Sequence, residues 1–79
     1  MENLDMTEAF AMEMAALEKA VETGKPVKLI FANGYQTKVV LESFDMEILI
    51  CRKVDYNTGK VDKDHRWIVC RDKLSTIEV

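Results

Sequence analysis

The sequence has little of what marks a membrane, metal-binding or disulfide-stabilised protein. No stretch of its 79 residues approaches the roughly 20 apolar residues that span a bilayer, and the acidic N-terminus lacks the basic start of a signal peptide. The two cysteines, Cys51 and Cys70, have no second Cys or His at metal-ligand spacing. We therefore predict a cytoplasmic protein whose two reduced thiols are small core or interface residues.

Catalytic signatures are also missing. The sequence contains no phosphate-binding glycine loop and no carboxylate dyad, and Ser43 and Ser75 lie in strand-like blocks with no His nearby. The single histidine, His65, stands in a polar segment and is interpreted as a solvated hairpin residue. The sequence therefore predicts no enzyme, no metal site and no cofactor.

Small size limits the core that this chain can bury. A chain of 79 residues is one domain, and it buries only about 60–65% of the surface that its unfolded state exposes. Such domains often gain stability from disulfides, metals or self-association. Because the first two are not indicated here, we predict self-association.

Charge is distributed unevenly along the chain. Residues 1–24 contain six acids and one base, a net charge of −5, whereas residues 25–79 contain ten bases and eight acids, a net charge of +2; the sum is −3. This is not the basic field that dominates nonspecific nucleic-acid binding. Any nucleic-acid contact is then expected to depend on a few well-placed residues.

The first part of the chain has the period of a helix. Apolar residues recur at i, i+4, i+7 and i+11 on one helical stripe: Phe10, Met14, Leu17 and Val21. Asp5 or Thr7 is suited to begin the helix, Gly24 to end it, and Pro26 prevents its resumption. We predict a helix over residues 5–22 whose stripe packs on a small core, because such a helix is only marginally stable alone.

After Pro26 the period changes to two, which is typical of β-strands. Asn33-Gly34 is the strongest short hairpin signal and predicts a type I′ turn, which needs two positive φ angles. Residues 55–60 have the composition of another turn. The sequence predicts five strands, over residues 27–32, 35–43, 48–54, 61–70 (with its clear core at 67–70) and 75–79.

One helix followed by five short antiparallel strands predicts a mostly β fold. In it an N-terminal helix (1–24) covers a small, bent, five-stranded, SH3-like barrel (25–79). The chain ends on an apolar strand, whose free edge needs a partner. Pairing of that edge with a neighbouring subunit, repeated from subunit to subunit, predicts a ring.

Four short motifs follow in order from the end of the predicted helix. They are Pro26-Val27, Asn33-Gly34, Glu42-Ser43-Phe44-Asp45 and Leu74-Ser75-Thr76. In this order and spacing, over residues 27–52 and 68–79, the sequence resembles the Sm-like family and in particular its bacterial Hfq branch. The resemblance implies an Sm-like barrel, a homo-oligomeric ring that is a hexamer in the Hfq branch, and RNA-chaperone activity on single-stranded RNA in post-transcriptional regulation.

The face that carries the helix, around the ring's pore, binds uridine-rich RNA in the Hfq branch. The resemblance assigns to this face Phe44, Met46, Glu47, Arg71 and Asp72. Of the residues that contact RNA there, only Arg71 keeps its chemistry, because Glu47 replaces a stacking aromatic ring and Asp72 replaces a cationic donor. We therefore expect weak uridine binding at this face.

The opposite face, around the first hairpin, reads adenine-rich RNA in this family and is better preserved here. The matching positions are Ile30, Gly34, Tyr35, Gln36, Thr37, Lys38 and Thr76. The resemblance implies that Tyr35 stacks a base, that Gln36 and Thr76 hydrogen-bond one, and that Lys38 meets phosphate. The alternative for Tyr35 is a residue of high β propensity beside the hairpin that contacts no ligand.

Two departures from the family pattern concern the fold. Val39 stands where the family usually bends its second strand at a glycine; a bend can also form through a bulge, so the barrel is still predicted. The segment between the third and fourth strands is also longer than in the Hfq branch, and it contains Tyr56, Lys60, Lys63, His65 and Arg66.

Two alternatives to an RNA-binding ring remain open. The first is an Sm-fold ring that binds protein partners and has lost RNA, which the acidic helix and the carboxylates expected around the pore favour. The second is a monomeric or dimeric SH3-like module whose motifs match by coincidence. Particle mass separates the second from a ring.

Overall fold

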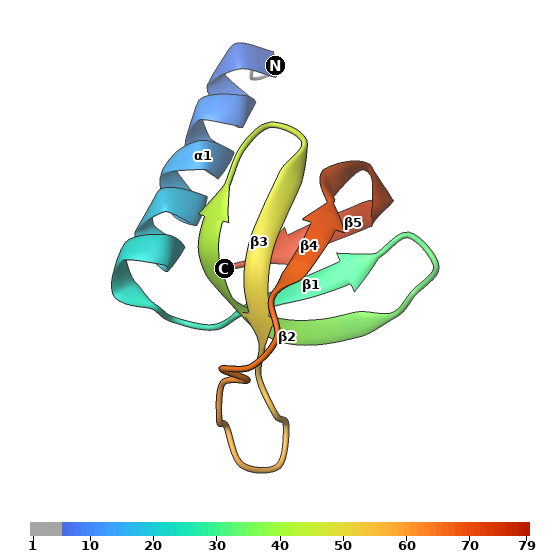
Figure 1. Cartoon of the computed structure of the whole chain (residues 1–79). Coiled ribbons are helices and arrows are strands. Elements are labelled where there is room, and N and C mark those ends of the chain that lie inside the picture. Colours follow the sequence, from blue (N-terminus) through green and yellow to red (C-terminus); the bar gives the residue numbers. More distant parts are fainter. Residues whose placement is uncertain (1–5) are drawn as a thin grey trace.

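The structure is a computed structural model that describes residues 6–79, and side-chain surroundings from residue 11 onward. One helix and five strands follow in order: α1 (Met6–Thr23), β1 (Val27–Phe31), β2 (Gln36–Phe44), β3 (Ile48–Lys53), β4 (Trp67–Cys70), the 3-10 turn η1 (Arg71–Lys73) and β5 (Leu74–Glu78) (Figure 1). The predicted helix start at Asp5 lies outside the described residues, as does the side chain of Phe10. The predicted order of elements is confirmed.

All five strands form one antiparallel sheet in the order β4-β3-β2-β1-β5. The sheet bends strongly and α1 packs beside it, as Figure 1 shows. Within residues 6–79, β4 and β5 do not pair with each other, so the barrel stays open and each of these strands has a free edge. The predicted bent fold is confirmed, as a sheet that does not close.

The bend in β2 comes with a bulge. The register between β2 and β3 shifts between Leu41 and Ser43, which leaves Glu42 as the extra residue. A bulge increases the local twist and bends its strand, so a glycine is not required. Val39, which stands where the family usually has a glycine, is completely buried. The bent strand therefore forms through a bulge and without the glycine.

The core lies between the concave side of the sheet and α1. Alternate strand residues point into it, and it includes Val27, Leu29, Val39, Leu41, Leu49, Cys51 and Val69. Leu17 and Ala20 of α1 cover this core, and Val21 packs at its border. The predicted stripe of α1 is therefore its core-facing side, at least from residue 11 onward.

The end of α1 follows the predicted glycine and proline signals. Gly24 has a φ of +69°, and its N–H donates to the Ala20 carbonyl at 3.0 Å. A left-handed residue at this position is most easily a glycine, because a side chain there is strained. Pro26 then leads directly into β1, since it cannot continue a helix. No helix in the described part of the chain is long and apolar enough to span a bilayer.

The two cysteines differ in their surroundings. Both are free thiols. Cys51 lies in the core, where desolvation and, to a smaller extent, the nearby Glu42 carboxylate raise its pKa to about 11. Cys70 is exposed on the edge strand β4. The prediction of core or interface residues is therefore confirmed for Cys51, which lies in the core. Cys70 is not a core residue, because β4 turns alternate side chains outward, and for it the interface remains a prediction.

Candidate nucleic-acid interface

The β1–β2 hairpin closes through a three-residue loop, Ala32-Asn33-Gly34. The Gly34 N–H donates to the Phe31 carbonyl at 2.9 Å, and the Phe31 N–H donates to the Tyr35 carbonyl at 2.8 Å. Gly34 has a φ of +92°, whereas Asn33 has a negative φ. The predicted type I′ turn is therefore wrong. The loop is instead of the kind in which a turn is followed by one left-handed glycine.

Asn33 acts through its side chain. Its Oδ1 accepts the Tyr35 backbone N–H at 2.9 Å, an Asx turn that fixes the start of β2. Tyr35 thus leaves the hairpin in a defined direction, with 48% of the residue exposed. Its ring lies 5.7 Å from the ring of Phe31, centroid to centroid, at an interplanar angle of 47°. Phe31 therefore supports one side of the ring and leaves much of it open to solvent.

Lys53 joins this hairpin to β4. Its Nζ donates to the Tyr35 hydroxyl at 3.5 Å and lies 4.8 Å above the Trp67 ring, a cation–π contact. We call Phe31, Tyr35, Lys53 and Trp67 the hairpin cluster. It combines aromatic faces with a cation, which is the combination that holds a stacked base and its phosphate.

Sequence reasoning did not assign Lys53 or Trp67 to this site. Period-two alternation along β3 places Cys51 and Lys53 on the same side, and Trp67 is paired with Cys51. The alternation along β3 can be read from the sequence. The register between β3 and β4 cannot, and it is this register that brings Lys53 and Trp67 together.

The other residues predicted for the hairpin face divide between two sides of the sheet. Ile30 pairs with Gln36 of β2 and with Thr76 of β5, so these three side chains form a row across three strands on the convex side. Gln36 and Thr76 are exposed, as are Gly34 and Lys38, whereas Ile30 is half-buried. In this row one hydrogen-bonding side chain lies on each side of the apolar Ile30.

Thr37 does not belong to this surface. Its residue is only 1% exposed, and it points into the core with its β2 neighbour Val39. Its hydroxyl has no hydrogen-bond partner among the described residues. The prediction that the Thr37 side chain is available to RNA is wrong, because the alternation of β2 turns it inward.

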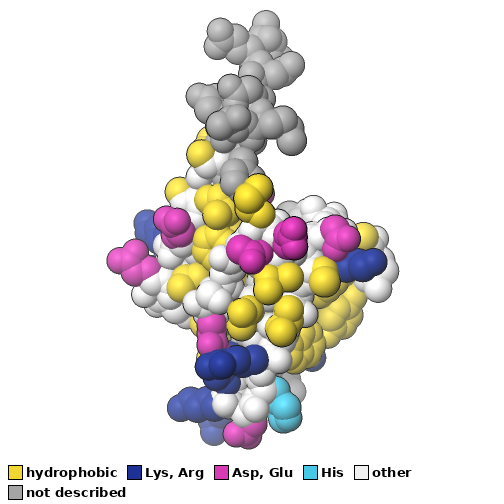
Figure 2. Space-filling model, turned by 45° about the horizontal axis from the view of Figure 1, so that its top comes forward, with side chains coloured by type: hydrophobic (Ala, Val, Ile, Leu, Met, Phe, Trp, Pro, Cys, Tyr) yellow, Lys and Arg dark blue, Asp and Glu magenta, His cyan; other side chains and the backbone are white. Residues whose placement is uncertain are grey.

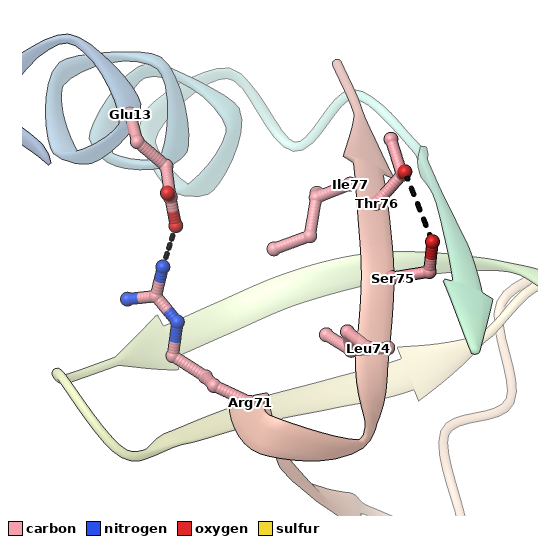
Figure 3. A pocket seen from close by; sticks show the side chains of 6 residues that line it. All are labelled: Glu13, Arg71, Leu74, Ser75, Thr76 and Ile77. Atoms are coloured by element: carbon pink, nitrogen blue, oxygen red, sulfur yellow. Dashed lines mark hydrogen bonds and ion pairs between the residues drawn. The ribbon is translucent and has the colours of Figure 1, made fainter. Parts of the chain in front are cut away.

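The helix-carrying face is organised around Arg71 of η1. Its guanidinium pairs with the Glu13 carboxylate of α1 and donates to the Asp45 carbonyl at 3.1 Å. Its side chain is only 14% exposed. Figure 3 shows the pair reaching from η1 to α1, beside Leu74 and Ile77 of β5. The cation that the sequence predicts for RNA contact at this face is therefore already neutralised within the chain.

Asp45 shapes the turn that carries the other residues of this face. Its Oδ1 accepts the backbone N–H groups of Glu47 at 2.7 Å and Ile48 at 2.8 Å. The bonds from Ile48 and Glu47 hold the pKa of the Asp45 carboxyl below its usual value, so it stays ionised at neutral pH. The carboxylate is thus used inside the turn.

The structure brings Met46, Glu47, Arg71 and Asp72 together around one shallow hollow. Met46, Glu47 and Asp72 are exposed, whereas Phe44 is half-buried against the core. Figure 2 shows acidic side chains scattered among hydrophobic ones over the part of the surface near α1. This face therefore offers carboxylates and apolar side chains rather than a cationic pocket.

Residues 6–79 contain no group of three or more His, Cys, Asp or Glu side chains that is arranged to hold a metal ion. What the surface around the β1–β2 hairpin offers a ligand is aromatic rings, lysine ammonium groups and uncharged hydrogen-bonding side chains. That chemistry suits a polyanion with stacking bases.

No family model and no curated protein matches the sequence. The structure is nevertheless similar to the crystal structure of the pleiotropic translational regulator Hfq, with a TM-score of 0.67 and 25% sequence identity. The match covers 86% of this chain and 98% of that chain. The chain therefore has an Hfq-like Sm fold, in which an N-terminal helix packs on a bent, unclosed antiparallel sheet.

Proposed function

We propose that this protein is a ring-forming RNA-binding protein that acts as an RNA chaperone in post-transcriptional regulation and holds adenine-rich single strands on its hairpin face. The observation that carries the proposal is the hairpin cluster, in which Lys53 contacts both the exposed Tyr35 and the half-buried Trp67. Base stacking on an aromatic side chain contributes about 1–3 kcal/mol per base, and a nearby ammonium group adds phosphate attraction.

The row across β2, β1 and β5 lies on the convex side of the sheet, opposite the side that carries Lys53 and Trp67. As a separate contact for the strand, it supports a preference for adenine. Gln36 and Thr76 each present both a donor and an acceptor, and an adenine edge also presents both. Ile30 between them supplies an apolar surface for the base. A purine also stacks over a larger area than a pyrimidine, which favours oligoadenylate over oligouridylate.

The two free sheet edges support the ring. β4 and β5 are different edges of one sheet, so pairing β4 of one subunit with β5 of the next is a heterologous contact. Because the sheet is strongly bent, each such contact turns the direction of assembly, and the contacts can close into a ring. We propose a hexamer, the ring size that the Hfq resemblance implies.

A ring gives weak sites a high combined affinity. Each subunit holds only one or a few nucleotides, but neighbouring sites on the same ring raise the effective concentration of the next nucleotide along the strand. No catalysis is required. The helix-carrying face contributes little in this proposal, because Glu13 already neutralises Arg71.

The test compares oligoadenylate and oligouridylate binding to the purified protein, with particle mass measured in the same buffer. Tyr35→Ala is expected to weaken oligoadenylate binding about fivefold or more, since it removes the stacking ring. Tyr35→Phe is the matched control, because it keeps the ring and loses only the hydroxyl contact with Lys53. It should retain most of the affinity.

Two other results would contradict RNA binding or the ring. A large particle that binds neither RNA at physiological salt contradicts RNA binding and favours a ring that binds protein partners. The neutralised Arg71 and the exposed apolar Met46, which is 70% exposed, support that second candidate. A particle of one or two chains, each of 9.1 kDa, contradicts the ring itself.

A further inference from the structure

The long segment between β3 and β4 is an ordered loop with its own internal hydrogen bonds. Val54 and Val61 form an isolated antiparallel bridge at its base. The Asp55 N–H donates to the Lys60 carbonyl at 2.9 Å, and the Asp62 N–H donates to the Lys53 carbonyl at 2.9 Å. The Val54 N–H also donates to the backbone carbonyl of Lys38 at 2.9 Å, which joins the loop to β2.

Two acidic side chains of this loop are engaged within it. Asp55 Oδ1 accepts the Asn57 N–H at 2.7 Å and the Thr58 N–H at 3.1 Å. Asp62 Oδ1 accepts the Asp64 N–H at 2.8 Å, and its Oδ2 lies 3.2 Å from Nδ1 of His65. These carboxylates stabilise turns and have fewer lone pairs left for other partners.

A hollow of about 670 Å³ lies beside these turns. Tyr56, Lys60 and Lys53 line it, together with the small polar side chains of Asn57 and Thr58. Asp55 and Asp62 also line it, with their carboxylates engaged in the turns described above. Tyr56 is 64% exposed and Lys60 is exposed. In Figure 2, Lys and Arg side chains gather around the histidine at one end of the molecule, which identifies that end as this loop because the chain has one His.

Lys53 belongs to both sites. It lines the loop hollow, and it also lies between Tyr35 and Trp67 in the hairpin cluster. Lys53 therefore contacts Tyr35 and also lines the hollow that Tyr56 lines. In Figure 1 the β1–β2 hairpin and the β3–β4 loop both extend away from α1, so a strand that contacts both stays clear of the acidic helix.

We propose that the β3–β4 loop hollow is a second nucleotide site, in which Tyr56 stacks a base of single-stranded RNA while Lys60 and Lys53 hold the flanking phosphates. The inference rests on the proposed RNA-binding function and extends it outward from the hairpin cluster. A strand that stacks on Tyr35 passes over Lys53 and reaches Tyr56. Because the loop is already ordered by its own hydrogen bonds, binding does not have to order it.

The experiment measures the affinity of the full-length protein for a labelled oligoadenylate of about 12 nucleotides, within the range of strand lengths that small single-strand binding sites cover. Tyr56→Ala should weaken binding about fivefold or more, since it removes one stacking ring. Lys60→Ala should make the slope of log affinity against log salt shallower by the amount that one phosphate contact contributes, about one. Lys63→Ala is the matched control, because Lys63 is an exposed lysine of the same loop that does not line the hollow.

The outcomes separate this inference from the function on which it rests. Wild-type binding that Tyr56→Ala and Lys60→Ala weaken, but Lys63→Ala does not, supports the second site. Wild-type binding that all three variants retain equally overturns the second site and leaves the hairpin face intact, which Tyr35→Ala then verifies. Absence of wild-type binding overturns the RNA function and the second site together. Mapping of ultraviolet crosslinks gives a direct readout, with RNA attached to the Tyr56 peptide as the supporting result.

Discussion

At the scale of single residues, the direction of each side chain decides its role. Tyr35 comes directly before β2 and Thr37 is its second residue, and both were expected to meet RNA. Tyr35 is 48% exposed, whereas Thr37 is 1% exposed within the core. The residue types alone do not distinguish them, because both tyrosine and threonine are common in strands. Their different exposure depends on how many residues of other elements pack over each position, which is a property of the fold.

The buried Thr37 hydroxyl gives a prediction about stability. A buried polar group without a partner costs about 1–3 kcal/mol, and Thr37 has none among the described residues. Thr37→Val removes the hydroxyl and keeps the branched shape, so we expect the free energy of unfolding to rise by about 1 kcal/mol. Denaturant unfolding at one fixed protein concentration measures it, as a higher midpoint with an unchanged slope.

The same variant also tests the role of Thr37 in binding. Because its side chain points inward, Thr37→Val should bind oligoadenylate like the wild type. A loss of stability, or a loss of RNA affinity at full stability, contradicts this account of the residue.

At the scale of elements, local sequence signals predicted the boundaries well and the contacts between elements poorly. Gly24, Pro26 and the change of period placed α1 and β1 correctly, because caps and alternation are local. The Asn-Gly signal predicted the hairpin but not its loop, since a one-residue change in register converts one loop type into the other. The contact of Lys53 with Tyr35 and Trp67 joins three strands, and no local pattern contains it.

The contact between α1 and η1 is likewise invisible in the sequence, because Glu13 and Arg71 lie near opposite ends of the chain. It gives a second prediction. Glu13→Gln removes the carboxylate that neutralises Arg71 and leaves the guanidinium available to phosphate. We expect oligouridylate affinity to rise by up to about fivefold, which corresponds to the upper end of the roughly 0.2–1 kcal/mol that a surface ion pair contributes.

Glu18→Gln is the matched control for that variant. It removes the same charge from an exposed position of the same helix, and no ion pair joins Glu18 to Arg71 in the described structure. Equal gains in the two variants indicate a general loss of negative charge rather than release of Arg71. No gain in either variant indicates that the helix-carrying face lacks a uridine site even when its cation is free.

At the scale of the whole molecule, the fold leaves two strand edges unpaired within the described chain. A free strand edge with exposed apolar side chains is a site for pairing with another chain. β4 carries such a side chain, since Ile68 is 68% exposed, and β5 is the opposite edge of the same sheet. Size and composition predicted self-association for a chain with a marginal core, and the open sheet offers the surfaces through which it can occur.

Substitution of Ile68 tests the ring and the avidity that it supplies. Ile68→Lys places a charge on the β4 edge, which is how many proteins prevent edge pairing, so we expect the particle to dissociate toward a single 9.1 kDa chain. Light scattering after size exclusion measures the mass. Met12→Lys is the control, since Met12 is 63% exposed but lies on α1 and not on an edge strand.

The affinity for RNA should fall when the ring dissociates. Long oligoadenylates gain affinity from several subunits at once, and a separated chain keeps only its own hairpin cluster. Ile68→Lys should therefore weaken a long oligoadenylate far more than a short one, whereas Met12→Lys should change neither. If Ile68→Lys preserves a large particle, the subunits assemble through another surface. If the particle dissociates but long-strand affinity is unchanged, one subunit supplies the whole site, and avidity is not the mechanism.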